Sequence, residues 1–332
     1  MTFHRGWFGL VFILTFAVAH TSVAETSLDA ERISDIVGVP AATKPDGVVR
    51  VAWPRNDVPL RVDGLAVRAA MGLGTWAAFQ AVPGAGAMVM GDTVVFEDEV
   101  NPALDAVLAG GLEVTAIHNH FLFDDPAVYF MHIGGRGDAE DLAAGVRRIW
   151  DAVRGVREQA PVPSSRFSGE VPTHGQLDTE ALERIIGASG GLQDGVFKIS
   201  IGRGAEMDGV AFRGSMGLTT WVAFAGSDEL AAVDGDFAMT AHEVRPVLAA
   251  LRGAGINIVA LHNHMIGETP TFYFVHFWGK GPAANLARGL RSALDVQRDA
   301  QGQAQARKPS QLTLDFEGPD ARGAFPRASQ RR

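Results

Sequence analysis

The chain has 332 residues, 47% of them hydrophobic, and a formal net charge of −9 at pH 7. This length allows a substantial core, arranged as two domains or as one domain built from two halves. The acidic balance argues against broad binding to nucleic-acid phosphates. The sequence contains no cysteine, which excludes disulfide bonds and the attachment of lipid to a cysteine.

The first 24 residues have the features of a signal peptide. Arg5 precedes an apolar run over residues 7–19, and Ser22-Val23-Ala24 is a small-x-small cleavage pattern. The run is shorter than the roughly 20 apolar residues that a bilayer span needs, so we expect cleavage near Ala24 and not an uncleaved anchor. The mature chain would then be periplasmic or secreted, with no transmembrane span.

The mature chain contains one pattern twice. Residues 71–79 match 216–224 at an offset of 145, and from Asp92, which aligns with Asp236, the offset is 144. A period this long indicates a domain duplication and not a solenoid. We expect a first repeat over 25–160, a Pro- and Ser-rich linker over 161–168, a second repeat over 169–300 and a flexible tail over 301–332, in which 312–314 could pair with a sheet edge.

Hydrophobic periodicity and turn residues predict the same elements in each repeat. In the first repeat they predict a helix over 28–37, strands over 48–53, 60–67, 75–82 and 87–96, a helix from Pro102 to Gly110, a hairpin over 113–121 and 127–134, and a helix over 139–153. Helices over 177–186, 246–252 and 283–296 are the counterparts. The expected fold is therefore α+β: two homologous repeats, each a mainly antiparallel sheet with a central histidine-bearing hairpin and packed helices.

The two hairpins carry six of the eight histidines of the mature chain. His118 and His120 lie two residues apart on a predicted strand, so they point to one face. If the hairpin pairs symmetrically about its loop, residues whose numbers sum to 250 lie opposite, and His132 faces His118. His262, His264 and His276 repeat this set.

Three imidazoles on one face can bind a divalent metal ion with a fourth position open for water or substrate. Zinc is the default ion for neutral nitrogen ligands, and copper, nickel, manganese and iron are compatible with them. Two alternatives stay open: a metal-free ligand or catalytic site, and core histidines that only satisfy hydrogen bonds.

Carboxylates and hydroxyl groups near the hairpins are further candidates. Glu99 lies just ahead of the helix that leads into the first hairpin, Glu243 is its counterpart in the second repeat, and both could act as a general base or an additional oxygen ligand. Loop carboxylates could orient the imidazole rings through hydrogen bonds; they are Asp124, Asp125 and Glu268.

Four more residues are candidates for ligand binding. Tyr129 and Tyr273 are the only tyrosines, and their phenols could bind an oxyanion or stack on a sugar, although core packing is the simpler explanation. Arg136 and Lys280 lie between glycines just before a helix and could bind a carboxylate or phosphate. A solvated turn residue is the alternative for both.

The repeated Met-Gly-Leu-x-Thr-Trp, His-Asn-His and Tyr-Phe-x-His pattern resembles the LppY/LpqO family of bacterial exported proteins with a domain of unknown function. The likeness covers about residues 28–300. Members are often lipoproteins, and because this chain has no cysteine, the resemblance implies a soluble exported form. His-Asn-His is not a nuclease signature here, because HNH nucleases spread these residues over a ββα metal motif and this chain has no basic stripe.

Two functions agree with the sequence. One is an exported protein that binds a divalent metal through the repeated histidines and that could be a metal-dependent hydrolase. The other is a non-catalytic module that binds a cell-envelope component or another small ligand, with structural histidines. The sequence alone does not decide whether the protein is an enzyme.

Overall fold

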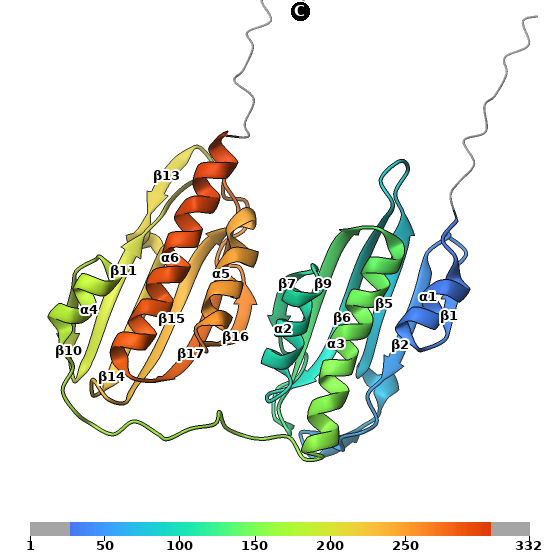
Figure 1. Cartoon of the computed structure of the whole chain (residues 1–332), viewed down its shortest axis with the longest axis horizontal. Coiled ribbons are helices and arrows are strands. Elements are labelled where there is room, and N and C mark those ends of the chain that lie inside the picture. The colour runs from blue at the N-terminus through green and yellow to red at the C-terminus, as the bar shows by residue number, and fades with distance from the viewer. Residues whose placement is uncertain (1–26, 307–332) are drawn as a thin grey trace, which may run out of the picture.

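The computed structural model describes residues 27–306, which form two successive copies of one arrangement (Figure 1). The first copy contains α1 (Ala30–Val37), β1 (Ala41–Thr43), β2 (Val49–Pro54), β3 (Leu60–Val62), β4 (Leu65–Val67), β5 (Gly74–Ala81), β6 (Ala87–Phe96), α2 (Val100–Ala109), β7 (Glu113–His118), β8 (Asp124–Asp125), β9 (Val128–Gly137) and α3 (Ala139–Gln159).

The second copy follows a segment, residues 160–178, without helix or strand. It contains α4 (Thr179–Ile186), β10 (Gly190–Gln193), β11 (Val196–Gly202), β12 (Gly204–Met207), β13 (Val210–Arg213), β14 (Thr219–Gly226), β15 (Ala231–Thr240), α5 (Ala241–Gly253), β16 (Asn257–His262), β17 (Phe272–Gly281) and α6 (Ala283–Ala306). Short 3₁₀ turns precede β5 and β14.

Twelve strands form one sheet in the order β1-β2-β5-β6-β9-β7-β16-β17-β15-β14-β11-β10. Every neighbouring pair in it is antiparallel. The order of the first six strands is repeated in reverse by the last six, so the repeats meet through equivalent edges. The predicted α+β class with mostly antiparallel pairing is confirmed.

The predicted elements hold with local differences. The helix predicted from Pro102 begins at Val100, and the strand predicted over 113–121 ends at His118. The strand predicted over 60–67 is a hairpin of β3 and β4, because Asp63 and Gly64 have positive φ angles of 48° and 79°, as a tight turn requires. The helix predicted over 246–252 begins at Ala241, because Thr240 and Glu243 form a capping box that starts it earlier. Both repeat-terminal helices extend beyond their predicted ends. The predicted pairing of 312–314 lies outside the described residues.

The six described helices cover one face of the sheet, as Figure 1 shows. The main core lies between these helices and the sheet, with large buried side chains such as Trp150, Phe79 and Phe277. Two smaller apolar clusters lie on the opposite face. One surrounds Phe130 beneath β3, and the other contains Phe274 and lies beside β13. The second face is therefore only partly covered, and the histidines lie on it.

Polar side chains hold the two repeats together where β7 and β16 meet. Only Ile117 and Leu261 are paired between these strands. The buried side chain of Asn101 in α2 accepts a hydrogen bond from the Ile258 N–H at 2.8 Å and donates one to the Ile258 carbonyl at 3.1 Å. Arg245, at the position equivalent to Asn101, donates to the Leu108 carbonyl at 2.7 Å. Each repeat thus satisfies backbone groups of the other.

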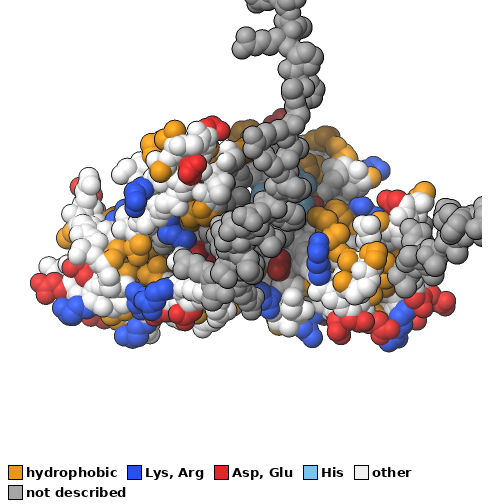
Figure 2. All heavy atoms as spheres, turned by 90° about the horizontal axis from the view of Figure 1, so that it is seen from above, with side chains coloured by type: hydrophobic (Ala, Val, Ile, Leu, Met, Phe, Trp, Pro, Cys, Tyr) orange, Lys and Arg blue, Asp and Glu red, His pale blue; other side chains and the backbone are white. Residues whose placement is uncertain are grey.

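Acidic and basic side chains are interspersed on the molecular face visible in Figure 2, without a large field of one sign. Among the described helices, none has the length and apolar content that a membrane span requires.

We predict that Asn101→Ala weakens the junction between the repeats. The substitution leaves the buried N–H and carbonyl of Ile258 without their partner, which costs about 1–3 kcal/mol of unfolding free energy. Chemical denaturation measures this loss. Gln193→Ala, which removes an exposed amide from β10, is the control and should leave stability unchanged. Equal stability of the two variants would contradict the assigned role of Asn101.

Candidate metal centres

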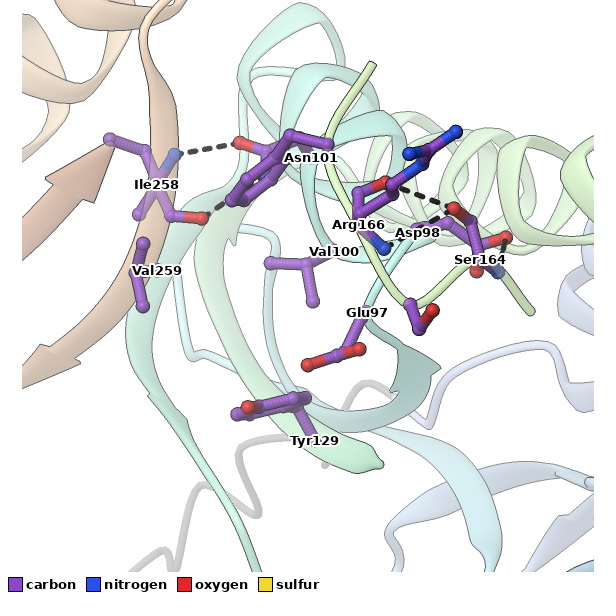
Figure 3. A pocket seen from close by; sticks show the side chains of 11 residues that line it. Glu97, Asp98, Val100, Asn101, Tyr129, Ser164, Arg166, Ile258 and Val259 are labelled. Carbon is purple, nitrogen blue, oxygen red and sulfur yellow. Dashed lines mark hydrogen bonds between the residues drawn. The ribbon is translucent and has the colours of Figure 1, made fainter. Parts of the chain in front are cut away.

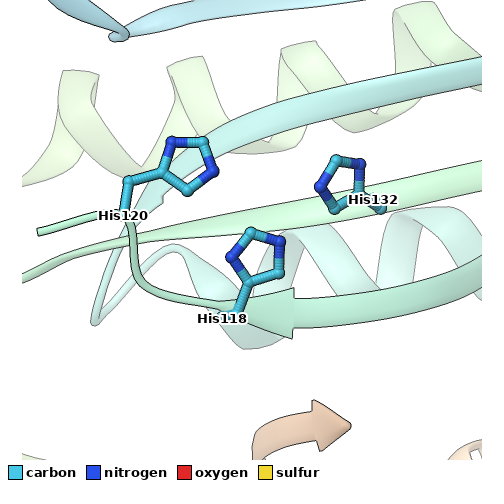
Figure 4. Close-up of side chains that lie close together, drawn as sticks. All are labelled: His118, His120 and His132. Carbon is cyan, nitrogen blue, oxygen red and sulfur yellow. The ribbon is translucent and has the colours of Figure 1, made fainter. Parts of the chain in front are cut away.

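The three histidines of the first repeat come together on the sheet face that lacks helices. His118 ends β7, His120 follows it, and His132 lies in β9, and Figure 4 shows their rings gathered over these two strands. Each ring offers one nitrogen, and these nitrogens lie within 4.8 Å of one another. The predicted convergence of the three imidazoles is therefore present.

The register of the hairpin differs from the prediction. Ala116, not His118, is paired with His132, and His118 is paired with Phe130, so paired residue numbers sum to 248 instead of 250. A shift by two residues preserves the face to which each side chain points. His118 and His132 are consequently diagonal neighbours with ring centroids 5.0 Å apart, and they still share one face.

Aromatic stacking fixes the third ring. His120 lies outside the strand and is exposed, but its ring stacks on Phe130 with centroids 3.3 Å apart and planes 9° apart. His264 stacks on Phe274 in the same way, at 3.5 Å and 9°. The apolar cluster behind each centre therefore positions the one histidine that the strand does not hold.

A buried carboxylate lies behind the first cluster and was not among the residues that we predicted for the site. Asp92 in β6 is paired with His132 and is only 6% exposed. Its Oδ1 atom has no hydrogen-bond partner among the described residues. Burial raises the pKa of Asp92, and the nearby charges of His132, His120 and His118 oppose that rise. The alignment of Asp92 with Asp236 was the sequence signal for this residue.

The second repeat brings its carboxylate into direct contact with the imidazoles. Asp236 is 1% exposed, and its Oδ2 lies 3.3 Å from Nε2 of His264 and 4.0 Å from Nε2 of His276. The Nε2 atoms of His264 and His262 are 3.2 Å apart. His276 is farther from the other ligand atoms, so the compact group of donors consists of Asp236, His262 and His264.

Backbone carbonyls determine which ring nitrogens carry protons. Nδ1 of His276 lies 3.1 Å from the Gly235 carbonyl, and Nδ1 of His264 lies 3.4 Å from the Gly217 carbonyl. A carbonyl only accepts hydrogen bonds, so we assign the proton to Nδ1 in both rings, which leaves a lone pair on Nε2. Metal-binding histidines commonly have this arrangement.

The geometry of these donors fits a tetrahedral metal ion. Zinc with nitrogen and oxygen ligands at about 2.0–2.1 Å separates those ligands by about 3.3 Å. The separations of 3.2 Å between the His264 and His262 nitrogens and 3.3 Å between His264 and Asp236 match this spacing. The unpartnered, buried Oδ1 of Asp236 indicates that the carboxylate lacks a positive partner.

In each cluster, one imidazole is shifted toward the neutral form that a metal requires. Burial lowers the pKa of His120, and the neighbouring His118 and His132 lower it further, against the opposing charge of Asp92. Burial also lowers the pKa of His262, followed by the effects of His264 and His276.

The two predicted catalytic glutamates are fully buried and form ion pairs. Both oxygens of Glu99 contact the Arg55 guanidinium, at 2.8 and 2.9 Å, and Arg157 lies 2.7 Å away. Glu243 contacts Arg203 in the same bidentate way, at 3.0 Å for each oxygen. Burial alone would raise the pKa of Glu243, but the hydrogen bonds and charge of Arg203 hold it below its usual range. These contacts give no support to a role as base or ligand.

The predicted tyrosines point away from the histidines. Tyr129 and Tyr273 pack against the main core on the helix side, whereas His118 stacks beside Phe130 on the other face. Tyr129 lines a pocket of about 180 Å³ between the repeats, which Figure 3 shows together with Glu97 and the linker residue Ser164. Tyr273 lines the equivalent pocket of about 130 Å³. Their predicted ligand binding would thus occur apart from the histidine clusters.

The predicted cations and loop carboxylates also have defined places. Arg136 is exposed near the end of β9, and Lys280 donates hydrogen bonds to the carbonyls of Phe167 and Gly169 in the segment between the repeats. Asp124 and Glu268 accept hydrogen bonds from backbone N–H groups four residues ahead, so they shape the loops. Asp125 is exposed in β8. No contact of these side chains with an imidazole nitrogen is present among the described residues.

The family described as Domain of Unknown Function (DUF1259) matches residues 31–152 and again residues 180–296. The chain belongs to the DUF1259 family. The double match confirms an internal repeat of a domain of unknown function, while the LppY/LpqO name stays a prediction. Among curated proteins, none matches this chain.

Three solved structures are distantly similar to this DUF1259 protein. The trimeric bacterial microcompartment shell protein PduB is 10% identical, with 78% of this chain and 90% of that chain covered and a TM-score of 0.18. EtuB from Clostridium kluyveri is 11% identical, with coverages of 80% and 92% and a TM-score of 0.18. The di-domain ARO/CYC StfQ from the steffimycin biosynthetic pathway is 10% identical, with coverages of 84% and 97% and a TM-score of 0.12. Scores this low carry no argument about fold or function.

We predict that Glu99→Gln destabilises the protein, because it leaves the charges of Arg55 and Arg157 buried with too little compensation. Breaking such a pair costs about 3–5 kcal/mol, which denaturant unfolding measures. Glu180→Gln breaks an exposed pair with Arg184 and should leave the midpoint unchanged. If Glu99→Gln unfolds at the wild-type midpoint, the glutamate does not hold the core together.

Proposed function

We propose that this DUF1259 protein is an exported protein that binds one divalent transition-metal ion in each repeat, with zinc as the default ion. Export rests on the signal-peptide pattern of the first 24 residues, which lie outside the described part of the chain. The proposed ligands are His118, His120 and His132 in the first centre and His262, His264 and Asp236 in the second, where His276, expected as a ligand from the sequence, lies beside the group. Asp92 supplies the adjacent negative charge in the first centre.

One observation carries this proposal. Three imidazole donors converge in the first repeat, two imidazole donors converge with Asp236 in the second, and the aspartate of each repeat is buried with an oxygen that has no partner among the described residues. Histidines that only satisfy core hydrogen bonds would not direct their remaining ring nitrogens at a shared point. Here the nearest polar neighbours of the Nε2 atom of His264 are His262 and Asp236, whose donor atoms face a common point. A cation at that point removes the cost of the desolvated carboxylate.

The arrangement also supports hydrolysis as the reaction class. A bound divalent ion would lower the pKa of a coordinated water toward neutrality and so supply a nucleophile. Asp92, which is not one of the three ligands of the first centre, would accept a proton beside the ion, a role for which we first considered Glu99 and Glu243. His120 and His264 are exposed, so a small molecule or a cell-envelope component can reach each centre from solvent.

We predict that the protein, purified without a histidine tag, contains about two transition-metal ions per chain by elemental analysis. His120→Ala and His264→Ala should each lower the content to about one ion, and the double variant should contain none. His174→Ala and His242→Ala are the matched controls, because both remove exposed histidines outside the clusters. A wild-type protein without stoichiometric metal would refute the proposal.

We also predict that chelation destabilises the wild type and not the double variant. An ion that binds only the folded chain adds binding free energy to stability, so its removal should lower the melting temperature by about 5–10 °C. Differential scanning calorimetry with and without a chelator tests this, and added zinc should restore the original value. A chelator effect of the same size in the double variant would place the responsible ion elsewhere.

A further inference from the structure

The sheet face that carries each proposed metal centre also carries a cation stacked on a tryptophan. The guanidinium carbon of Arg50 lies 4.1 Å from the centroid of Trp76. The ammonium nitrogen of Lys198 lies 4.1 Å from the centroid of Trp221. Both tryptophans are half-buried.

Strand register places these pairs beside the histidines. Trp76 is paired with Asp92, and Asp92 is paired with His132. Directly paired residues point to the same face, so tryptophan, aspartate and histidine form a row across three strands. Trp221, Asp236 and His276 form the equivalent row.

The contact is closest in the second repeat. The rings of Trp221 and His276 meet edge to face with centroids 6.3 Å apart. The indole of Trp221 therefore contacts both the ammonium group of Lys198 and the imidazole of His276.

The cation occupies the same place in both repeats despite an insertion in the sequence. Arg50 is paired with Ala78, two residues after Trp76, and Lys198 is paired with Ala223, two residues after Trp221. The tryptophans are 145 positions apart, whereas the cations are 148 apart. The register of the strands, and not a constant spacing along the chain, places a positive charge over each tryptophan.

Neither cation is neutralised by the protein. Within residues 27–306, Arg50 and Lys198 have no carboxylate within 4.0 Å and no side-chain hydrogen bond. By contrast, Arg55 and Arg203, which follow β2 and β11, each form a bidentate pair with a glutamate. Stacking on an indole orients a cation and leaves its hydrogen-bond donors free for a ligand.

We propose that each centre binds a ligand with two anionic groups, one at the metal and one at the cation over the tryptophan. The metal would lie near β7 and β9 in the first repeat, and β5 is two strand spacings from β9, which is roughly 10 Å. The spacer between the anionic groups would pass along the half-buried indole. This inference rests on the proposed metal binding and adds the substrate class: dicarboxylates or bisphosphates with a spacer of this length.

Isothermal titration calorimetry with matched probes tests the ligand class. The probes are decanedioate and decane-1,10-bisphosphonate, with decanoate and decylphosphonate as the singly headed controls. The metal-loaded wild type should bind a doubly headed probe about tenfold more tightly than its singly headed control. The bisphosphonate and dicarboxylate arms distinguish a phosphate ligand from a carboxylate ligand. Equal affinities for singly and doubly headed probes in both arms would overturn the inference.

Variants of the cations test the site. Arg50→Gln combined with Lys198→Gln should remove the tenfold advantage, whereas Arg50→Lys combined with Lys198→Arg, which exchanges the cations of the two repeats, should keep most of it. Arg184→Gln combined with Arg298→Gln, on α4 and α6, makes the same change in net charge and should keep the advantage. An advantage that survives in the first variant would overturn the inference.

Metal analysis of the same samples separates this inference from the proposed function. A wild type without metal refutes the proposed function. A metal-loaded wild type without preference for doubly headed probes refutes only the inference. The Arg50→Gln and Lys198→Gln double variant should retain its full metal content, and loss of metal in it would show that the cations are structural, which also overturns the inference.

Discussion

The arrangement of the sheet face that carries the histidines depends on two carboxylates that are buried away from water. Asp92 and Asp236 lie inside ten-residue strands, with neighbouring strands on both sides, and their Oδ1 atoms have no partner among the described residues. A desolvated carboxylate is costly unless a positive charge compensates it. Burial lowers the pKa of His120 and of His262, which favours the neutral ring at these two positions. A neutral ring does not compensate the charge of the carboxylate, whereas a bound metal cation would.

Duplication explains why a buried carboxylate that needs a positive partner occurs twice on one face of the sheet. The repeats join through β7 and β16, which are the strands that carry the His-Asn-His segments, so both centres lie near the middle of the continuous sheet. The helices cover the other face in both repeats. Equivalent positions also serve the junction, since Asn101 and Arg245 each bond to backbone groups of the opposite repeat. The same symmetry places Tyr129 and Tyr273 in paired pockets between the repeats.

The local sequence pattern predicted much of this arrangement, but it did not predict contacts between residues that are far apart in the sequence. The histidine clusters were predictable because alternation has a period of two, which a register shift of two residues preserves. The burial of Glu99 was not, because its partner Arg55 is 44 positions away and no spacing rule connects them. Asp92 alone looks like any polar strand residue until its pairing with His132 is known. The face to which Tyr129 points was predictable from strand alternation. Tyr129 is three residues from His132, so the two side chains point to opposite faces of the sheet.

Joining the repeats at β7 and β16 has a consequence for self-association. Each six-stranded unit has two edges, and the junction uses one edge from each, so the complete sheet ends only at β1 and β10. These strands have three and four residues, respectively. Short outer strands offer few unpaired amides to another molecule. The short edge strands β1 and β10 therefore limit the pairing of this sheet with other molecules, and so limit its growth into aggregates.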